Sequence, residues 1–464
     1  MFFRQYQLAC LSHFSYLIGD ETTGRAVVVD PQRDVSGYLA DAAANGLVVE
    51  GVIETHFHAD FLSGHLELAA ATGAAISYGD AAHPDFEIEP LGDGERLSLG
   101  AVNLEIRHTP GHTPEAISIV VRRRPDAEPW AVLTGDTLFI GDVGRPDLAT
   151  SVGWSAPDLA RALRRSLQTQ LLTLPDATRV YPAHGAGSAC GKQLSTDTVS
   201  TIGAQRADNH ALAPMTEDAF IELLTQGLAA PPPYFAFAAD ANRHHHDLLD
   251  DHQAPDRLGI DAVNAARRDA GAVIVDARPP EAFAAGHLKG SINVGLDGRF
   301  AEFVGDVIKP EQPVVIVADP GRELETRVRL ARIGFDRVIG YLHIEATLAC
   351  HPDLAARAHR VTASAVDGWR AERPGLQIVD VRSPTETSAG TLPGAHTIPL
   401  AALVDSIDTL DPQAPTLVYC AGGYRSSIGA STLRAHGFGA VADLIGGYSA
   451  WTDHQRRQPS TPAQ

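Results

Sequence analysis

The sequence predicts a multidomain α/β protein in which short buried strands alternate with helices. At roughly 150 residues per domain, the 464-residue chain has room for about three domains. Strands rich in Val and Ile recur along it, with stretches of helical periodicity between them. The second half also repeats one strand–loop–helix–strand unit in degenerate form. We therefore expect a β-rich first domain followed by two smaller domains with mostly parallel sheets.

The first domain is expected at residues 2–245, where short apolar strands end in polar residues. The runs "RAVVVD", "VVEGVIETH" and "WAVLTGD" finish in Asp or His. Residues 34–46 and 156–174 carry apolar residues at helical spacing between such strands. Strands that end in His and Asp predict a sheet edge at which chemistry takes place.

A linker is expected at residues 246–258, because the periodicity fails there and prolines and charges gather. His244, His245 and His246 lie at its start. We interpret this run as a solvated segment in preference to a metal-binding tract.

Two copies of one α/β unit follow the linker. The stretch "VIVDARPPEAFAAGHLKGSINV" parallels "QIVDVRSPTETSAGTLPGAHTIPL", and "VVIVADPGRELETR" parallels "TLVYCAGGYR". The copies are expected at residues 259–355 and 361–458, here called the silent copy and the cysteine copy. Aligning their second strands places Asp319 of the silent copy at the position of Cys420, so only the cysteine copy carries a thiol there.

Charge and cysteine usage limit the class of function. The chain has 57 acidic and 37 basic residues, a formal net charge of -20, which opposes binding to nucleic acid or anionic membranes. A small-molecule substrate is expected instead. The sequence has no run of eighteen apolar residues that would predict a membrane span, and its N-terminal stretch lacks the apolar core of a signal peptide. Four scattered cysteines indicate free thiols in a reducing compartment, and hence a cytoplasmic protein.

Polar residues at successive strand ends of the first domain predict a metal site. Each follows an apolar run and precedes turn residues, and imidazoles with a carboxylate suit zinc or iron. The residues are His56, His58, His112, Asp136 and His184.

These motifs resemble the metallo-β-lactamase superfamily over residues 2–245, which implies an αββα sandwich. In that family H-x-H-x-D-H, a later His, a bridging Asp and a final His build two metal sites. His56, His58, His112 and Asp136 match the first site, and Asp60, Phe61 and His184 fall at positions of the second. Because Phe61 cannot ligate a metal, one ion is expected.

A single ion on His56, His112 and Asp136 would have two imidazole ligands and one carboxylate, the facial set of non-heme Fe(II) oxygenases. Zinc fits the same atoms, so the ligands alone leave both metals open. His58, with His184 and Asp60, is expected either as a further ligand or as a group that orients water or substrate.

The stretch "FIGDVGRPDLAT", directly after Asp136, resembles the signature of persulfide dioxygenases within this superfamily. The resemblance implies oxidation of a thiol persulfide to sulfite with iron and O₂, and a substrate pocket shaped by Arg145 and Asp147. Arg145 would also supply local positive charge for an anionic thiol carrier. Tyr181 and Cys190, which flank "PAHGAGSA", are expected at the same site.

The cysteine copy contains a loop suited to sulfur chemistry. In "VYCAGGYRSS", Cys420 ends an apolar strand and is followed by Ala421, Gly422, Gly423 and Tyr424 before a helix. Inward-pointing amides and the helix N-terminus stabilise a thiolate or a persulfide anion. The C-x4-R spacing to Arg425 is shorter than the C-x5-R of cysteine phosphatases. With "IVDVRSPTE" and "LIGGYSAW", it resembles rhodanese, a sulfurtransferase, over residues 361–458.

Taken together, the chain resembles fusions of a persulfide dioxygenase with rhodanese-like domains in bacterial sulfide detoxification. We expect Fe(II) and O₂ to convert a glutathione, coenzyme A or similar persulfide to sulfite, and Cys420 to pass on sulfane sulfur, yielding thiosulfate. One alternative is a zinc-dependent thioester hydrolase with an accessory sulfurtransferase, and another is a non-catalytic sulfur carrier or sensor. The sequence leaves the thiol carrier and a homo-oligomeric state open.

Overall fold

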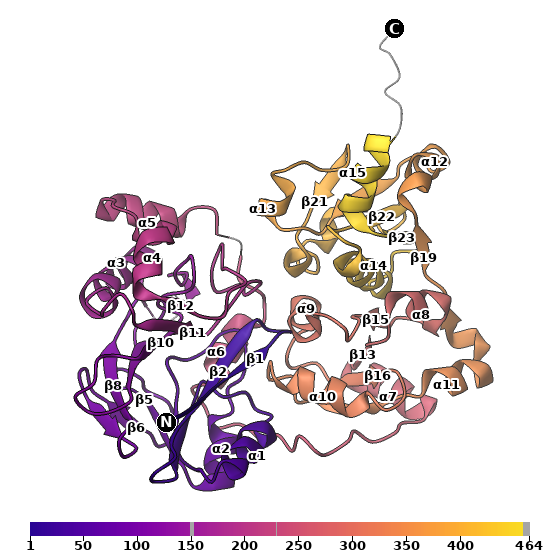
Figure 1. The fold of residues 1–464 in the computed structure, drawn as a ribbon. Helices are drawn as coiled ribbons and strands as arrows, with labels where there is room; N and C mark the ends of the chain where they lie inside the picture. Colours follow the sequence, from indigo (N-terminus) through magenta and orange to yellow (C-terminus); the bar gives the residue numbers. More distant parts are fainter. Residues whose placement is uncertain (149–152, 229, 458–464) are drawn as a thin grey trace. The chain divides into compact units, whose positions relative to one another are not determined.

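The computed structural model describes residues 1–148, 153–228 and 230–457, and Figure 1 traces the chain. It divides into two compact units: Met1–Asp251 with Ala331–Gly334, and His252–Leu330 with the chain from Phe335 onward. Ala149 and Thr150, which end the stretch "FIGDVGRPDLAT", lie outside the described residues, as does residue 458 at the predicted end of the cysteine copy. The limits predicted for the individual domains stay predictions.

Two six-stranded sheets form the first unit. The first sheet has the order β1-β2-β3-β4-β5-β6, with strands Phe2–Leu8, His13–Asp20, Arg25–Val29, Val48–Ile53, Ala75–Gly79 and Glu89–Leu91. The second has the order β12-β11-β10-β9-β8-β7, with β7 to β12 at Arg96–Ser98, Asn103–His108, Ile117–Arg122, Ala131–Gly135, Arg179–Pro182 and Ser200–Thr201.

Successive side chains of a strand point to opposite faces of its sheet, so each sheet can turn an apolar face to the other, and the two pack face to face. In β2, Phe14, Tyr16 and Ile18 join a core shared with Ile117 and Ile119 of β9. Helices cover the outer faces: α1 and α2 pack on the first sheet, and α3, α4 and α5 lie beside β10 to β12 on the second (Figure 1). The helices span Ser36–Ala44, His65–Thr72, Ala156–Ser166, Ile202–Asp208 and Glu217–Thr225, with α6 at Phe235–Ala241. The predicted αββα sandwich is confirmed.

Both copies of the repeat lie in the second unit, apart from Ala331–Gly334 of the silent copy. The silent copy has a parallel sheet of order β15-β13-β16-β17, with strands Ile292–Asn293, Val273–Asp276, Val314–Val317 and Val338–Tyr341. The short strands β14 and β18, His287–Leu288 and Ala355–Ala356, pair beside it. Its helices α7 to α11 span Ile260–Ala270, Pro280–Ala285, Phe300–Val307, Glu323–Ala331 and Ile344–Cys350.

The cysteine copy has a five-stranded parallel sheet of order β19-β23-β22-β20-β21. Its strands are His359–Val361, Val441–Leu444, Thr416–Tyr419, Gln377–Asp380 and Ala395–Thr397. Helices α12 to α15 span Val366–Ala371, Pro384–Thr387, Tyr424–Ala435 and Gly447–Arg457.

The same buried ion pair recurs in both copies. Arg278 pairs with Asp276 at 2.6 Å and donates to the Gly286 carbonyl at 3.0 Å. In the cysteine copy, Arg382 pairs with Asp380 at 2.6 Å and donates to the carbonyl of Gly390 at 2.7 Å. A bidentate Arg fixes the loop after the first central strand, so the sequence repeat is also a structural repeat.

Strand pairing corrects the predicted alignment of the two copies by one residue. Asp276 lies opposite Val317, and the equivalent Asp380 lies opposite Tyr419. Ala318, and not Asp319, therefore occupies the position of Cys420. Two glycines with positive φ, Gly321 at 88° and Gly423 at 102°, then coincide as well. Sequence similarity is weak in this loop, whereas hydrogen-bonded register defines position directly, and either alignment leaves the silent copy without a thiol.

Within the described part of the chain, no helix has both the length and the apolar character needed to span a membrane.

Candidate metal centre and sulfur-transfer loop

The predicted metal ligands lie on loops that follow strands of the sandwich. His56 and His58 follow β4, His112 lies between β8 and β9, and Asp136 directly follows β10. His184 follows β11, which runs parallel to β10. All five side chains are buried, with at most 2% of their surface exposed. Strand ends from both sheets thus bring together residues far apart in sequence.

Three of these residues form one group suited to a single metal ion. Ligand atoms of His56, His112 and Asp136 all lie within 4.8 Å of one another. The Nε2 atoms of His56 and His112 lie 3.8 and 3.4 Å from Asp136 Oδ2. Metal–ligand bonds of about 2.1 Å place neighbouring ligand atoms about 3 Å apart. Asp136 Oδ2 is buried with no hydrogen-bond partner among the described residues, so an ion here fits the donor set.

Hydrogen bonds at the far side of each imidazole orient its ligating nitrogen. His112 Nδ1 donates to the Arg145 carbonyl at 2.9 Å. His56 Nδ1 lies 2.9 Å from Thr55 Oγ1, which itself donates to Asp30 at 3.0 Å. A protonated Nδ1 leaves the Nε2 lone pair free, the arrangement expected of a metal-ligating histidine.

The charge states of this group suit a cation. Burial holds the pKa of His56 well below its ordinary value, so the imidazole is neutral at pH 7. Burial alone would raise the pKa of Asp136, but His184 and His112 outweigh it and hold that pKa well below its ordinary value. His56 therefore offers a neutral imidazole and Asp136 a carboxylate to a cation.

His184 lies between two carboxylates at the positions of the family's second metal. Its Nδ1 contacts Asp136 Oδ1 at 2.8 Å, and its Nε2 contacts Asp60 Oδ2 at 2.7 Å. Burial would lower the pKa of His184, but Asp136 and Asp60 outweigh burial and hold it well above its ordinary value. Each ring nitrogen of His184 thus lies close to one carboxylate oxygen, and Nδ1 is hydrogen-bonded to Asp136.

Phe61 lies beside His13 and His58. Its fully buried ring packs against those of His13 and His58, with centroids 4.1 and 4.3 Å apart. A phenyl ring offers no ligating atom here, and the expectation of one ion stays a prediction.

His58 lies outside the group of three. Its Nε2 is 3.2 Å from Asp30 Oδ1 and 3.6 Å from Glu54 Oε2, and it also groups with Asp60 and His184. Asp30, Glu54 and Thr55 were not predicted as site residues. The one signal for Asp30 was its place at the end of the strand "RAVVVD", whereas its contacts depend on tertiary structure. The role of His58 stays a prediction.

Arg145 is tied to the metal group through its backbone. Its carbonyl accepts from His112, and its own amide donates to the Cys190 carbonyl at 3.0 Å. The guanidinium forms a bidentate pair with Asp147, at 2.6 and 2.7 Å. The expected positive charge of Arg145 is therefore largely balanced by Asp147.

Cys190 and Tyr181 differ in their surroundings. Cys190 is buried, with Sγ within 4.8 Å of ligand atoms of Asp136 and His184. Burial, followed by Asp60 and Asp136, raises its pKa well above the ordinary value, which keeps it a thiol. Tyr181 instead packs in an aromatic cluster, with its ring 4.8 Å from Phe3 and 6.1 Å from Trp130. Their substrate contacts stay predictions.

The loop from Cys420 to Tyr424 directs one backbone amide at the thiol, and its role as a persulfide cradle stays a prediction. Cys420 directly follows β22 and is buried, and the Gly423 amide donates to its Sγ at 3.1 Å. Gly422 is exposed, so the rim of the loop faces solvent. The start of α15 holds the other side: the amide of Tyr448 donates to the Cys420 carbonyl at 2.7 Å. A Cβ at Gly447 would lie 2.2 Å from that carbonyl oxygen, so only glycine fits there.

Arg425 is held at the base of this loop by Glu386. The two side chains form a bidentate pair, at 2.6 and 2.8 Å. Burial favours the neutral acid, but Arg425 outweighs it and lowers the pKa of Glu386 to about 2. The carboxylate also caps α13 through Ser383.

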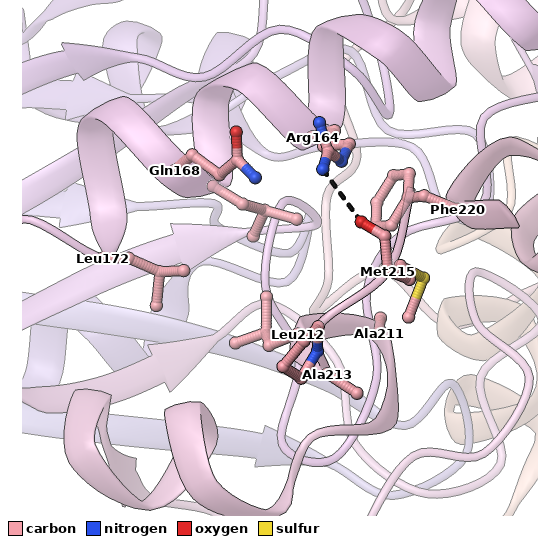
Figure 2. Close-up of a pocket in the computed structure, with 10 residues that line it drawn as sticks. Arg164, Gln168, Leu172, Ala211, Leu212, Ala213, Met215 and Phe220 are labelled. Atoms are coloured by element: carbon pink, nitrogen blue, oxygen red, sulfur yellow. Dashed lines mark hydrogen bonds between the residues drawn. The ribbon is translucent and has the colours of Figure 1, made fainter. Parts of the chain in front are cut away.

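A cavity of about 250 Å³ lies elsewhere in the first unit, between α3 and the segment that leads into α5 (Figure 2). Figure 2 shows Arg164 bonded to the Met215 carbonyl, at 3.1 Å, above an apolar lining that includes Phe220. None of the predicted site residues lines this cavity.

Comparisons with known proteins agree with this architecture. A model of the metallo-beta-lactamase superfamily matches residues 8–184, and a model of the rhodanese-like domain matches residues 260–343 and 363–454. The mitochondrial persulfide dioxygenase of Homo sapiens is 30% identical over 233 residues, which cover 49% of this chain and 82% of that protein.

Two further proteins are similar to this chain. A probable metallo-hydrolase of Burkholderia pseudomallei is 32% identical over 248 residues, covering 46% of this chain and 81% of that protein. The crystal structure of a metallo-beta-lactamase from Staphylococcus aureus has 31% identity and a TM-score of 0.66, and the match covers 74% of this chain and 98% of that one.

In this chain the metal domain is joined to two rhodanese-like domains, and a persulfide dioxygenase is among the similar proteins. The chain thus belongs to the metallo-β-lactamase superfamily.

Proposed function

We propose that the protein is a non-heme iron persulfide dioxygenase coupled to a sulfurtransferase. The observation that carries the proposal is the buried group of His56, His112 and Asp136, together with Phe61, a residue without a ligating atom, at a second-site position of the motif. Two imidazoles and one carboxylate with open positions are typical of Fe(II) that reacts with O₂.

In the overall reaction, a thiol persulfide, O₂ and water give the thiol, sulfite and two protons. The outer sulfur is oxidised and O₂ is reduced. Bound Fe(II) would supply the redox partner and the template for both substrates.

Residues of the chain supply orientation. Thr55 and the Arg145 carbonyl hold His56 and His112 in the ligating tautomer. The buried Cys190 thiol lies beside Asp136, where it would contact the persulfide group. Arg145 and Asp147 would shape the pocket for a glutathione, coenzyme A or similar carrier.

Cys420 would carry out sulfur transfer. Its thiolate attacks the outer sulfur of a persulfide, the S–S bond breaks, and the released thiol takes the proton and leaves Cys420 persulfidated. Sulfite then attacks that sulfane sulfur, thiosulfate forms, and the Cys420 thiolate returns. The Gly423 amide and the N-terminus of α14 would stabilise the anion in each state. Because both sites are on one chain, sulfite would form at a raised effective concentration near its acceptor.

Oxygen uptake tests the dioxygenase. Protein loaded with Fe(II) is given glutathione persulfide and, separately, coenzyme A persulfide. We expect rapid uptake with sulfite or thiosulfate as product, lost in His112→Ala and kept in the exposed control His83→Ala. The more active persulfide identifies the carrier.

A zinc-dependent thioester hydrolase is the second candidate, favoured by the likeness to a probable metallo-hydrolase. Zinc in the purified protein, no oxygen uptake with either persulfide, and hydrolysis of S-D-lactoylglutathione would replace the dioxygenase with this activity. The sulfurtransferase would be unaffected by that outcome.

A further inference from the structure

Asn293 of the silent copy contacts α14, the helix that follows the sulfur-transfer loop at residues 420–424. The hydrogen-bonding groups of its side chain are all used. Asn293 is buried, and its Nδ2 donates to the carbonyls of Asp276 at 2.9 Å and Arg278 at 2.8 Å. Both amide hydrogens are therefore used within the silent copy, which leaves Oδ1 to face the other way. Oδ1 accepts from the hydroxyl of Ser427 on α14 at 2.8 Å.

A second bond joins the same two elements. The backbone amide of Asn293 donates to Ser431 Oγ at 2.9 Å. Ser427 and Ser431 are four residues apart on α14, so they present hydroxyls from one face of the helix. Both are buried. Breaking either bond would leave a buried polar group unsatisfied, which is costly.

The loop itself is held by Tyr424, the first residue of α14. Its hydroxyl donates to the Gly295 carbonyl, and its ring packs edge-on to Phe303 of α9 at 5.6 Å. A Cβ at Gly298 would lie 3.0 Å from this ring, and one at Gly295 would lie 3.3 Å from it. Glycines in the silent copy thus allow its backbone to approach the loop closely.

These contacts help to fix the backbone amide of Gly423, which faces Cys420. Gly423, whose amide donates to Cys420 Sγ, directly precedes Tyr424. On the opposite side the loop is held by α15 of its own domain, through the bond from Tyr448 to the Cys420 carbonyl. The direction of α14, and with it the Gly423 amide, therefore depends on contacts from both copies.

We propose that the silent copy positions the sulfur-transfer loop, with Asn293 as a positioning residue that acts through Ser427 and α14 on the amides around Cys420. The inference rests on the proposed transfer by Cys420 and adds to it a function for the copy that has no thiol. The silent copy is then a working part of the site and not a spacer.

The test measures the reactivity of Cys420 in the full chain. Alkylation of Cys420 by iodoacetamide is followed against pH by peptide mass spectrometry. Thiocyanate formation from glutathione persulfide and cyanide gives kcat and KM for transfer. The variants are Asn293→Ala and Ser427→Ala. The control is Ser291→Ala, which removes a buried hydroxyl of the silent copy that bonds only to the Leu288 carbonyl.

We expect Asn293→Ala and Ser427→Ala each to shift the alkylation profile to higher pH and to lower kcat about tenfold, with KM little changed. The double variant should be no worse than Asn293→Ala, because the bond lost in Ser427→Ala is already lost in that variant. Ser291→Ala should match the wild type. If Asn293→Ala fails to fold, Ser427→Ala carries the test, since Asn293 then keeps its own bonds.

An unchanged alkylation profile and kcat in folded Ser427→Ala would overturn the inference, as would an equal loss in Ser291→Ala. Failure of the proposed function is distinguishable from this: the wild type would then form no thiocyanate, while its alkylation profile would still report whether Ser427 and Asn293 act on Cys420.

Discussion

The two rhodanese-like copies share one frame but differ in the residues that face the loop. Both have the buried Asp–Arg pair, and both have a left-handed glycine just before the helix, Gly321 or Gly423. In the cysteine copy the amide of this glycine bonds to Cys420 Sγ at 3.1 Å. In the silent copy the Gly321 amide bonds instead to the Glu323 carboxylate at 2.9 Å.

The two copies therefore share the residues that maintain the fold and differ in the residues that bear chemistry at the loop. By strand register, Ala318 replaces Cys420 and Glu323 replaces Arg425. Pro320 replaces Gly422, which removes one N–H from the loop. The silent copy thus lacks the thiol, one amide donor and the guanidinium, whereas the residues that maintain the fold are present in both copies.

Removing the Cys420 thiol should have the largest effect. Cys420→Ser is expected to abolish thiosulfate formation, because a hydroxyl cannot carry sulfane sulfur, while oxygen uptake persists at the separate metal site. Parallel assays of oxygen and thiosulfate measure this. Loss of both activities in a folded variant would contradict the division of labour between the two sites.

Replacing Arg425 by the Glu that stands at the equivalent position of the silent copy should have the next largest effect. Arg425→Glu places a carboxylate beside Glu386 and near Cys420, which disfavours a thiolate and repels anionic persulfides. We expect sulfur transfer to fall on the order of 100-fold. Glu323→Arg, the reverse change in the silent copy, is the control and should leave the transfer rate unchanged.

The two left-handed glycines allow a matched comparison of strain and function. Gly423→Ala and Gly321→Ala should each destabilise the protein by about 1–2 kcal/mol, because both need positive φ. A Cβ at Gly423 would also lie 3.0 Å from the Gly446 amide, whereas one at Gly321 meets no atom within 4 Å. Transfer should fall about tenfold only in Gly423→Ala, as measured by thiocyanate assay alongside chemical denaturation.

The Arg425–Glu386 pair should produce a smaller, pH-dependent effect on stability. The pKa of Glu386 is lowered from an ordinary value near 4.5 to about 2. A depressed carboxyl pKa stabilises the fold fully above the unfolded pKa, and this contribution is lost as pH falls towards the folded pKa. The thermal midpoint of Arg425→Gln should therefore lie below that of wild type at pH 7, and the gap should narrow between pH 4.5 and 2. A gap independent of pH would contradict an ionic origin.

The sequence by itself determined what local patterns can encode. Strand ends bearing His56, His112 and Asp136, the substitution of Phe61, the C-x4-R loop at Cys420 and the repeat were all readable from residue type and spacing. Each depends on neighbours within a few residues, or on a motif whose parts end successive strands.

Only the tertiary structure decided which distant side chains meet. The link from Asp30 through Thr55 to His56, the pairing of His184 with Asp60 and Asp136, and the bond from Asn293 to Ser427 join residues that no local pattern connects. The register that places Ala318 at the cysteine position is of the same kind, because strand pairing is set by packing and hydrogen bonds across the sheet. Residue chemistry is local, whereas the orientation and charge state of a buried group depend on what the fold brings next to it.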